Sequence, residues 1–383
     1  MKDEKAILPG STLGMLGGGQ LGGFFAEAAL RLGYKVCVWD PSPNAPAKRF
    51  ASISFDGGFD NEETIKQFTR LVDCVSLEWE NVPASLVEIL EQELRVRPGS
   101  RSLRLAQDRT LEKSFLKDQG FTVADYEVVH SKMELKNLSL PLPWIIKTAT
   151  EGYDGHGQWR ISDRESIKPV LDVITGDGPW VVERIVPFMM ELSVVVSIGA
   201  NRNCVTYPPT ENIHEDGILR ISISPGRIGK SITESAQRLA QEVVQRIGDP
   251  GVFCVEMFLL NNGDLIVNEI APRPHNSGHH TIDSFSVSQY ELQVRTLCDL
   301  PLVNPIKNGD SVLLNILGQE AMTLSKPHIT NTVMGNDYAR FYFYGKESVR
   351  PGRKMGHILF TGSDNETLLK EAIEAHNQIS SQT

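Results

Sequence analysis

The sequence predicts a mixed α/β protein of two or three domains, and two patterns carry this prediction. Near the N-terminus, β-branched apolar runs alternate with helical patterns, an order typical of an open α/β sheet. Farther along, two longer apolar runs flank an Asn-Gly pair, which is a strong hairpin signal. A chain of 383 residues is long enough for more than one hydrophobic core.

The predicted elements follow one another along the whole chain. Strands are expected at 11–16, 35–40, 74–77, 143–147, 158–162, 180–186, 191–197, 252–260, 265–270 and 338–344. Helices are expected at 24–33, 61–70, 88–93, from 107 onward, at 233–248 and at 287–297. A Pro-Gly pair at 98–99 indicates a boundary, so we expect the N-terminal domain to end near residue 105.

Composition narrows the class of protein. The net charge of −10, without a long basic run, argues against nucleic acid or an anionic membrane as a partner. The sequence has no uncharged apolar run long enough to span a bilayer and no secretory signal at its start. Its five cysteines are scattered without a C-x-x-C pair, which fits a reducing compartment. We therefore expect a soluble, cytoplasmic protein.

The predicted hairpin brings two carboxylates together. If Asn262 and Gly263 are the two central turn residues, position 261 faces 264, 259 faces 266, and Glu256 faces Glu269. Opposed like charges among apolar neighbours are costly, and a divalent cation between them removes that cost. Mg2+ fits, because one or two carboxylates and substrate phosphates commonly hold it. The alternatives are that one glutamate is solvated at a strand edge or that a bulge shifts the register.

A glycine-rich turn joins the first strand to the first helix. Gly17, Gly19 and Gly22 satisfy the pattern G-x-G-x-x-G, and Asp40 ends the second strand. In dinucleotide-binding folds such a turn binds the pyrophosphate and such an acid binds a ribose. An NAD-dependent oxidoreductase is therefore one interpretation. The other is a turn that lets the backbone approach a different ligand, or that simply packs closely.

The segment after the hairpin carries a specific resemblance. Residues 268–279, NEIAPRPHNSGH, resemble the ATP-grasp enzymes, and among them the 5-(carboxyamino)imidazole ribonucleotide synthase family. Three further segments resemble the same family: QDRTLEK at 107–113, GYDGHGQ at 152–158 and RPGRKMGH at 350–357. The chain departs from the family pattern at His156, where the family has lysine, and this change weakens one expected phosphate contact.

The resemblance implies an ATP-grasp fold of α/β and α+β class, with an N-terminal Rossmann-like (preATP-grasp) domain. The implied domains are 1–105, the Rossmann-like domain; 106–188, the small lid domain; and 189–383, the large domain with a C-terminal phosphate-clamp segment. The resemblance also implies a homodimeric ATP-dependent ligase of purine biosynthesis that uses ATP, Mg2+ and bicarbonate. This enzyme would N-carboxylate 5-aminoimidazole ribonucleotide through carboxyphosphate, or through carbon dioxide released from it.

Most of the implied site residues serve the nucleotide. The resemblance assigns phosphate contacts to Arg109, Lys147 and the glycine-rich loop, adenine contacts to Glu183 and the linker after it, and ribose contacts to Glu191. Glu256 and Glu269 would bind the metal. The full set implied for the nucleotide is Arg109, Lys147, Gly152, Tyr153, Asp154, Gly155, His156, Gly157, Gln158, Glu183, Arg184, Ile185, Val186, Glu191, His214, Asn268 and Glu269. By themselves, most of these residues would pass for ordinary loop or strand-end groups in solvent.

The remaining implied residues serve the ribonucleotide and the chemistry. The substrate set is Gln20, Leu21, Glu78, Asn81, Tyr153, Arg273, Lys346 and Arg353, with Arg350 as a further candidate. Lys346 and Arg353 would hold the 5′-phosphate, although a solvated basic turn is the ordinary interpretation of such a segment. The catalytic set is Arg273, His275, Asn276 and Asp154, of which Arg273 and His275 would hold carboxyphosphate. No residue stands out as a general base.

Three alternatives compete with this interpretation. A sister ATP-grasp enzyme that uses formate on glycinamide ribonucleotide shares the hairpin, but we do not expect it to share GYDGHGQ and RPGRK together. An NAD-dependent oxidoreductase is supported by the glycine-rich turn and Asp40 alone. A non-catalytic binding protein would explain His156, but both hairpin carboxylates and Lys147 are present.

Overall fold

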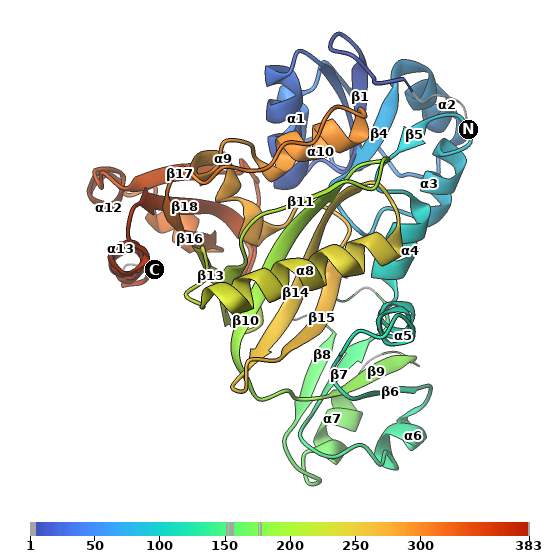
Figure 1. Cartoon of the computed structure of the whole chain (residues 1–383), viewed down its shortest axis with the longest axis vertical. Coiled ribbons are helices and arrows are strands. Elements are labelled where there is room, and N and C mark those ends of the chain that lie inside the picture. Colours follow the sequence, from blue (N-terminus) through green and yellow to red (C-terminus); the bar gives the residue numbers. More distant parts are fainter. Residues whose placement is uncertain (1–4, 151, 153–156, 175, 177, 382–383) are drawn as a thin grey trace.

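The computed structural model describes residues 5–150, 152, 157–174, 176 and 178–381, which form three sheets and the helices around them (Figure 1). The N-terminal sheet is parallel, with strand order β3-β2-β1-β4-β5. Its elements are β1 (Thr12–Leu16), α1 (Gln20–Arg31), β2 (Lys35–Trp39), η1 (Pro46–Phe50), β3 (Ile53–Phe55), α2 (Glu62–Leu71), β4 (Cys74–Leu77), α3 (Ala84–Leu90), β5 (Arg95–Val96) and α4 (Ser100–Gln107). The strand order changes direction between β1 and β4, and such switch points are where open α/β sheets bind ligands, at the carboxyl ends of the strands.

Most predicted elements of this sheet are confirmed, and one is displaced. Asn61, which begins the predicted helix at 61–70, is the N-cap of α2 and accepts the Thr64 N–H at 2.9 Å. The helix expected at 88–93 is wrong in its limits, because α3 already begins after Pro83 and ends at Leu90. The apolar residues of 84–87 were not recognised as its first turn.

A small antiparallel sheet follows, with strand order β6-β9-β7-β8. Its elements are β6 (Tyr126–Val129), α6 (Lys132–Lys136), β7 (Trp144–Thr148), β8 (Gln158–Ile161), α7 (Ile167–Val173) and β9 (Trp180–Arg184). Trp144, Ile146, Trp180 and Val182 form its core with residues of the two helices. The helix α5 (Arg109–Asp118) lies between this small sheet and the central sheet (Figure 1).

The central sheet has strand order β15-β14-β10-β12-β13-β16-β18-β17, and β11 pairs with β10. Its strands are β10 (Phe188–Ile198), β11 (Cys204–Thr206), β12 (Thr210–Glu215), β13 (Ile218–Ser224), β14 (Gly251–Leu260), β15 (Leu265–Ala271), β16 (Asp310–Leu317), β17 (Ala339–Phe343) and β18 (Lys354–Gly362). Its helices are α8 (Lys230–Ile247), η2 (Asn276–Gly278), α9 (Thr281–Ser284), α10 (Gln289–Leu297), α11 (Glu320–Thr323), α12 (Pro327–Met334) and α13 (Asn365–Ser380). The apolar stripe of α8 packs on β10 and β14, and α13 packs on β16 and β18.

The helix α10 joins the N-terminal sheet to the central sheet. Tyr290 and Val294 share a core with Phe25 of α1, and Figure 1 shows the two helices side by side. Gln293 Nε2 donates to Ser76 Oγ at 2.9 Å and to the Leu77 carbonyl at 3.1 Å. This contact places the carboxyl end of β4 beside the central sheet. None of the helices in the described part of the chain combines the length and the apolar character that a membrane crossing needs.

Candidate active site

The hairpin of β14 and β15 places Glu256 opposite Glu269, as predicted. The other predicted pairs are wrong, because Leu259 faces Leu265 and the Leu260 N–H donates to the Asp264 carbonyl at 2.9 Å. The loop therefore has three residues rather than two, and Gly263 adopts a φ of 90° that a side chain would strain. A β-bulge then inserts Asn268 and restores the pairing of the two glutamates.

The bulge directs two neighbouring side chains to the same face of the sheet. Val267 and Ile270 both belong to the core under α8, and the two residues between them point away from that core. On β14, Val255 and Met257 belong to the same core. The bulge therefore presents Asn268 and Glu269 together with Glu256 on the opposite face.

The two glutamates differ in charge environment. His275 Nε2 lies 3.0 Å from Glu256 Oε1. Burial would raise the pKa of Glu256, but this imidazole holds it at about 2. Burial, and then the charge of Glu256, raise the pKa of Glu269. A cation between the two carboxylates would replace this repulsion by attraction.

The residues present fit Mg2+. Asn268 Oδ1 is buried and has no hydrogen-bond partner among the described residues, so an oxygen ligand is available beside the two carboxylates. The described residues contain no cluster of three or more His, Cys, Asp or Glu suited to a metal. Mg2+ does not require such a cluster, because it commonly keeps water and substrate phosphates as its other ligands.

Two buried lysines share one buried carboxylate between the small sheet and the hairpin. Glu183 Oε1 lies 2.9 Å from Lys147 Nζ, and Glu183 Oε2 lies 3.3 Å from Lys113 Nζ. Burial would raise the pKa of Glu183, but the two ammonium groups lower it to about 2. The carboxylate expected to meet the adenine amino group is thus directed to the lysines, and the adenine contact stays a prediction.

The residues expected at the ribose and the adenine lie where the small sheet meets the central sheet. Glu191 Oε2 on β10 lies 2.7 Å from His214 Nδ1 on β12. Burial would lower the pKa of His214, but Glu191 raises it. The strand β9 ends at Arg184, so Ile185 and Val186 lie in the linker between the sheets rather than in a strand.

The segment expected to bind the nucleotide phosphates, residues 152–158, lies only partly within the described residues. We call it the phosphate segment. Arg109 begins α5 and donates from Nη1 to the Thr148 carbonyl and from Nη2 to the Gly152 carbonyl, both at 3.1 Å. Gln158 begins β8 and pairs with Lys147 of β7, directly after Gly157. The remaining predicted residues of this loop, Tyr153, Asp154, Gly155 and His156, lie outside the described residues.

The catalytic candidates gather at the end of β15. Arg273 forms a bidentate ion pair with Glu80, in which Nη2 donates to Oε1 at 2.8 Å and Nε donates to Oε2. His275 Nδ1 lies 2.8 Å from Ser277 Oγ, which accepts a hydrogen bond from Ser193 Oγ at 2.7 Å. These contacts fix the orientation of the imidazole ring between Ser277 and Glu256.

Asn276 is the candidate whose own bonding points most directly to a ligand. The residue is 6% exposed, yet both polar atoms of its side chain have no partner among the described residues. A buried amide is costly unless something binds it. A substrate or a bound water is therefore expected to complete its hydrogen bonds.

The glycine-rich turn already holds two carboxylates of the protein itself. The Gly22 N–H donates to Glu78 Oε2 at 2.6 Å, and the Gly18 N–H donates to Asp40 Oδ2 at 2.7 Å. A Cβ at Gly19 would collide with Glu78. The groups that would bind a pyrophosphate and a ribose in an NAD enzyme are thus engaged within the protein, which argues against the NAD interpretation.

The residues predicted for the ribonucleotide border this turn. Gln20 and Leu21 form the first turn of α1, and Asn81 is exposed after β4. Burial raises the pKa of Glu78, which the nearby Lys346 partly offsets. The glycine-rich turn therefore lies near the C-terminal basic segment, residues 346–354.

The C-terminal basic segment is held by its own backbone. Lys346 Nζ donates to the Lys354 carbonyl at 2.8 Å, and Arg353 Nη1 donates to the Ser348 carbonyl at 2.7 Å. Arg350 is exposed. Asn44 Nδ2 donates to Glu347 Oε2 at 3.1 Å, which connects this segment to the N-terminal sheet.

Several residues that complete the site are not among those predicted from the sequence. They are Glu80, which pairs with Arg273; Ser193 and Ser277, which orient His275; and Glu112 and Lys113, which contact the hairpin. Glu112 and Lys113 lie within the segment that resembles QDR-x-x-EK, so a signal was present for them. Ser277 lies within the segment NEIAPRPHNSGH, so a signal was present for it as well. Ser193 had no signal, because its partner Ser277 comes from a distant part of the chain.

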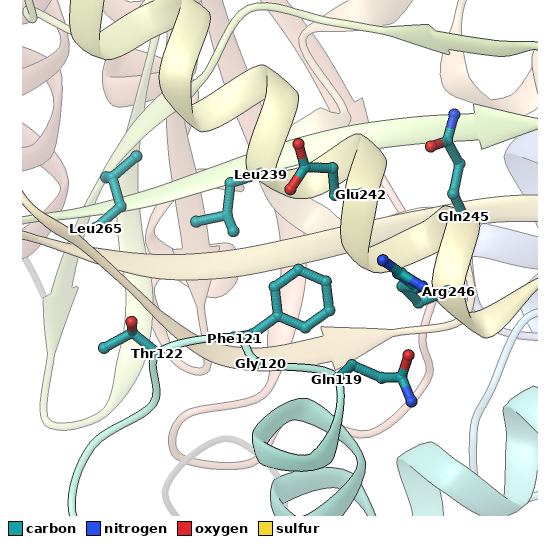
Figure 2. A pocket seen from close by; sticks show the side chains of 9 residues that line it. All are labelled: Gln119, Gly120, Phe121, Thr122, Leu239, Glu242, Gln245, Arg246 and Leu265. Carbon is teal, nitrogen blue, oxygen red and sulfur yellow. The ribbon is translucent and has the colours of Figure 1, made fainter.

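A cavity of about 680 Å3 lies apart from these residues. It is lined by Phe121 and its neighbours after α5, by Leu239, Glu242 and Arg246 of α8, and by Leu265 (Figure 2). Its described lining includes no predicted site residue.

Known proteins match almost the entire chain. Residues 11–107 match the Ribonucleotide synthetase preATP-grasp domain, 114–290 the ATP-grasp domain, and 311–371 the Phosphoribosylaminoimidazole carboxylase C-terminal domain. The N5-carboxyaminoimidazole ribonucleotide synthase of Bacillus subtilis is 36% identical over 371 residues, which are 96% of each chain. The Phosphoribosylaminoimidazole carboxylase of Saccharomyces cerevisiae is 34% identical over 361 residues, 91% of this chain but 63% of that longer protein.

Solved structures agree with these matches. The ADP complex of an N5-carboxyaminoimidazole ribonucleotide synthetase has a TM-score of 0.93 at 33% identity, with all of both chains covered. The Aspergillus clavatus N5-carboxyaminoimidazole synthase with ADP and 5-aminoimidazole ribonucleotide has a TM-score of 0.89 at 30% identity, covering 97% and 99% of the two chains. The predicted ATP-grasp fold with an N-terminal preATP-grasp domain is confirmed.

Proposed function

Because the chain belongs to the N5-carboxyaminoimidazole ribonucleotide synthase family, we propose that it is an ATP-dependent ligase of purine biosynthesis. Its substrates are 5-aminoimidazole ribonucleotide, ATP and bicarbonate, and its products are N5-carboxyaminoimidazole ribonucleotide, ADP and phosphate. The observation that carries the proposal is the pair of opposed carboxylates, Glu256 and Glu269, with the buried Lys147 near Glu269. The buried amide of Asn276, which has no hydrogen-bond partner among the described residues, adds to it.

The nucleotide lies between the small sheet and the central sheet in this proposal. Lys147 and Arg109 bind its phosphates as charge-assisted donors. The backbone of Arg184, Ile185 and Val186 faces the adenine, and Glu191, paired with His214, accepts from the ribose hydroxyls. The segment 152–158 closes over the phosphates.

Glu256, Glu269 and the oxygen of Asn268 are the residues that would hold Mg2+. Bound there, the ion would offset negative charge on the nucleotide phosphates. Lys147 adds a fixed positive charge near Glu269, because Glu183 anchors its ammonium group at 2.9 Å. Fixed charges of this kind stabilise the phosphoryl-transfer transition state without further reorganisation.

The first chemical step joins bicarbonate to ATP. A bicarbonate oxygen attacks the γ-phosphorus, the bond to the bridging oxygen of ADP breaks, and carboxyphosphate and ADP result. Arg273 and His275 hold the carboxyphosphate, and Asn276 and Asp154 complete the site. Glu80 orients Arg273 through their ion pair, and Ser277 orients His275.

The second step transfers the carboxyl group to the ribonucleotide. The exocyclic amine attacks the carboxyl carbon of carboxyphosphate, or of carbon dioxide released from it, and inorganic phosphate leaves. Phosphate is basic enough to accept the proton that the amine loses. Gln20, Leu21, Glu78 and Asn81 face the ribonucleotide, and Lys346 and Arg353 bind its 5′-phosphate. The site must exclude water, because carboxyphosphate hydrolyses readily.

The proposal also covers the domain limits, the oligomeric state and the location of the protein. We place the domain limits at 1–105, 106–188 and 189–383. The linker at 185–187 between the small and central sheets supports a limit close to residue 188, which is already the first residue of β10. We expect a homodimer, which light scattering would test. The five unpaired cysteines support a cytoplasmic location.

Isotope transfer tests the proposed chemistry. With 18O-bicarbonate, the released phosphate is expected to carry one 18O atom, because a bicarbonate oxygen becomes bonded to the γ-phosphorus. Phosphate without 18O would mean that water, not bicarbonate, attacks ATP. Turnover without the ribonucleotide provides the control for uncoupled hydrolysis.

A further inference from the structure

Two side chains of α5 contact β15 on either side of Glu269. The Glu112 carboxylate accepts the Ile270 N–H at 2.6 Å, and Lys113 Nζ donates to the Asn268 carbonyl at 2.9 Å. Both side chains are buried. Because β15 lies at the edge of the central sheet, its outer backbone groups need partners other than a strand. The Thr122 carbonyl accepts the Val267 N–H, and Glu112 and Lys113 supply the partners around Glu269.

These two backbone groups flank Glu269, directly after the inserted Asn268. Without the bulge, the three-residue loop would pair Glu256 with Asn268, and the side chain of Glu269 would turn towards the core under α8. A one-residue shift would therefore remove one of the two carboxylates from the site. The contacts of Glu112 and Lys113 oppose that shift on both sides of Glu269.

We propose that Glu112 and Lys113 are positioning residues that hold the bulge at Asn268 and so keep Glu269 opposite Glu256. This inference rests on the metal role proposed above for the two glutamates. The same helical turn begins with Arg109, whose guanidinium holds the Thr148 and Gly152 carbonyls. One turn of α5 therefore connects the phosphate segment to the metal carboxylates.

Metal binding in the presence of ADP tests the proposal. The probe is Mn2+, and its free concentration is followed by electron paramagnetic resonance. Lys113→Met and Glu112→Leu are expected to weaken Mn2+ binding about 10- to 100-fold, as is typical when a partner of a metal ligand is lost. Glu112→Gln keeps an oxygen for the Ile270 N–H and should change the affinity less than about threefold.

A matched control lies on the same helix. Lys117 is exposed and lies over the ring of Tyr126, so Lys117→Met should bind Mn2+ like the unchanged protein. Hydrogen exchange gives a second measurement that needs no metal. The amide of Ile270 should exchange faster in Glu112→Leu and at the normal rate in Lys117→Met.

The outcomes separate the inference from the metal assignment. If Glu269→Gln weakens Mn2+ binding while Lys113→Met and Glu112→Leu do not, the positioning role is wrong and the metal assignment stands. If Glu269→Gln also binds Mn2+ normally, the metal assignment fails and the inference fails with it. If Lys113→Met does not fold, the comparison of Glu112→Leu with Glu112→Gln decides alone.

Discussion

Glu183 carries a buried negative charge that two lysines compensate. Its buried carboxylate is shared by two buried ammonium groups, so each of the three charges depends on the others. This arrangement fixes Lys147 before any nucleotide binds. At the scale of one residue, the structure thus fixes the ammonium group that we propose for the nucleotide phosphates.

Removing the Glu183 charge should destabilise the protein. Glu183→Gln leaves two ammonium groups without compensation, at a cost of about 3–5 kcal/mol near neutral pH. The pKa of Glu183 is about 2 in the folded protein, below its ordinary value of 4.5, so its contribution is full above pH 4.5 and is lost as the pH falls towards 2. Urea midpoints of the two proteins should differ strongly at pH 7 and less at pH 4. The exposed Glu165→Gln is the control, and a gap independent of pH would contradict the account.

Asn276 should matter for turnover rather than for stability. Its amide is buried without a partner among the described residues, so Asn276→Ala removes a group that costs free energy in the free protein. We expect an unchanged or higher unfolding temperature and a kcat/KM for the ribonucleotide lowered about tenfold or more. A large loss of stability with normal kinetics would show that the amide is a structural group.

At the scale of elements, the hairpin shows what a sequence can and cannot predict. The apolar runs and Asn262-Gly263 located both strands, and the pairing of Glu256 with Glu269 was predicted correctly. The loop length and the position of the bulge were not predicted. The longer loop shifts the register by one residue, and the bulge shifts it back by one, so the predicted pairing of the two glutamates is still correct. A bulge has no signal in the strand itself, because its stabilising contacts come from Glu112 and Lys113 on another element.

The loop geometry makes its own prediction. Gly263 has a φ of 90° with open space around it, so Gly263→Ala should cost about 1 kcal/mol through backbone strain alone. Asn262→Ser keeps an oxygen that can accept the Asp264 N–H, now bonded at 3.1 Å, and should cost less than about 0.5 kcal/mol. Chemical denaturation measures both, and equal losses would argue against the three-residue loop.

At the scale of the whole molecule, α10 and its flanking residues hold the N-terminal sheet against the central sheet. Arg97, which follows β5, pairs with Asp299 and donates to the Thr296 carbonyl at 2.5 Å. The sequence located the sheets, but not this docking, because the docking depends on contacts between residues about two hundred positions apart. The same distance explains why the pairing of Glu80 with Arg273 was missed.

Breaking this contact should loosen the N-terminal sheet. Arg97 is 6% exposed, so Arg97→Met removes its buried hydrogen bonds to the Thr296 carbonyl and to Asp299, which keeps its pair with Arg95 at 3.2 Å, and should cost about 1–3 kcal/mol. Limited proteolysis should then cleave faster in the segment between β5 and α5. Arg104→Met removes an exposed pair with Glu88 and should behave like the unchanged protein. Equal cleavage of all three proteins would mean that Arg97 does not hold the docking.

ADP release from ATP and Mg2+, with 5-aminoimidazole ribonucleotide and bicarbonate each present or omitted, tests the proposed reaction most directly. We expect ADP formation to rise sharply when the ribonucleotide is added, and to be lost in Glu256→Gln and Glu269→Gln. ADP formation that is indifferent to the ribonucleotide would leave the fold in place but contradict the proposed substrate.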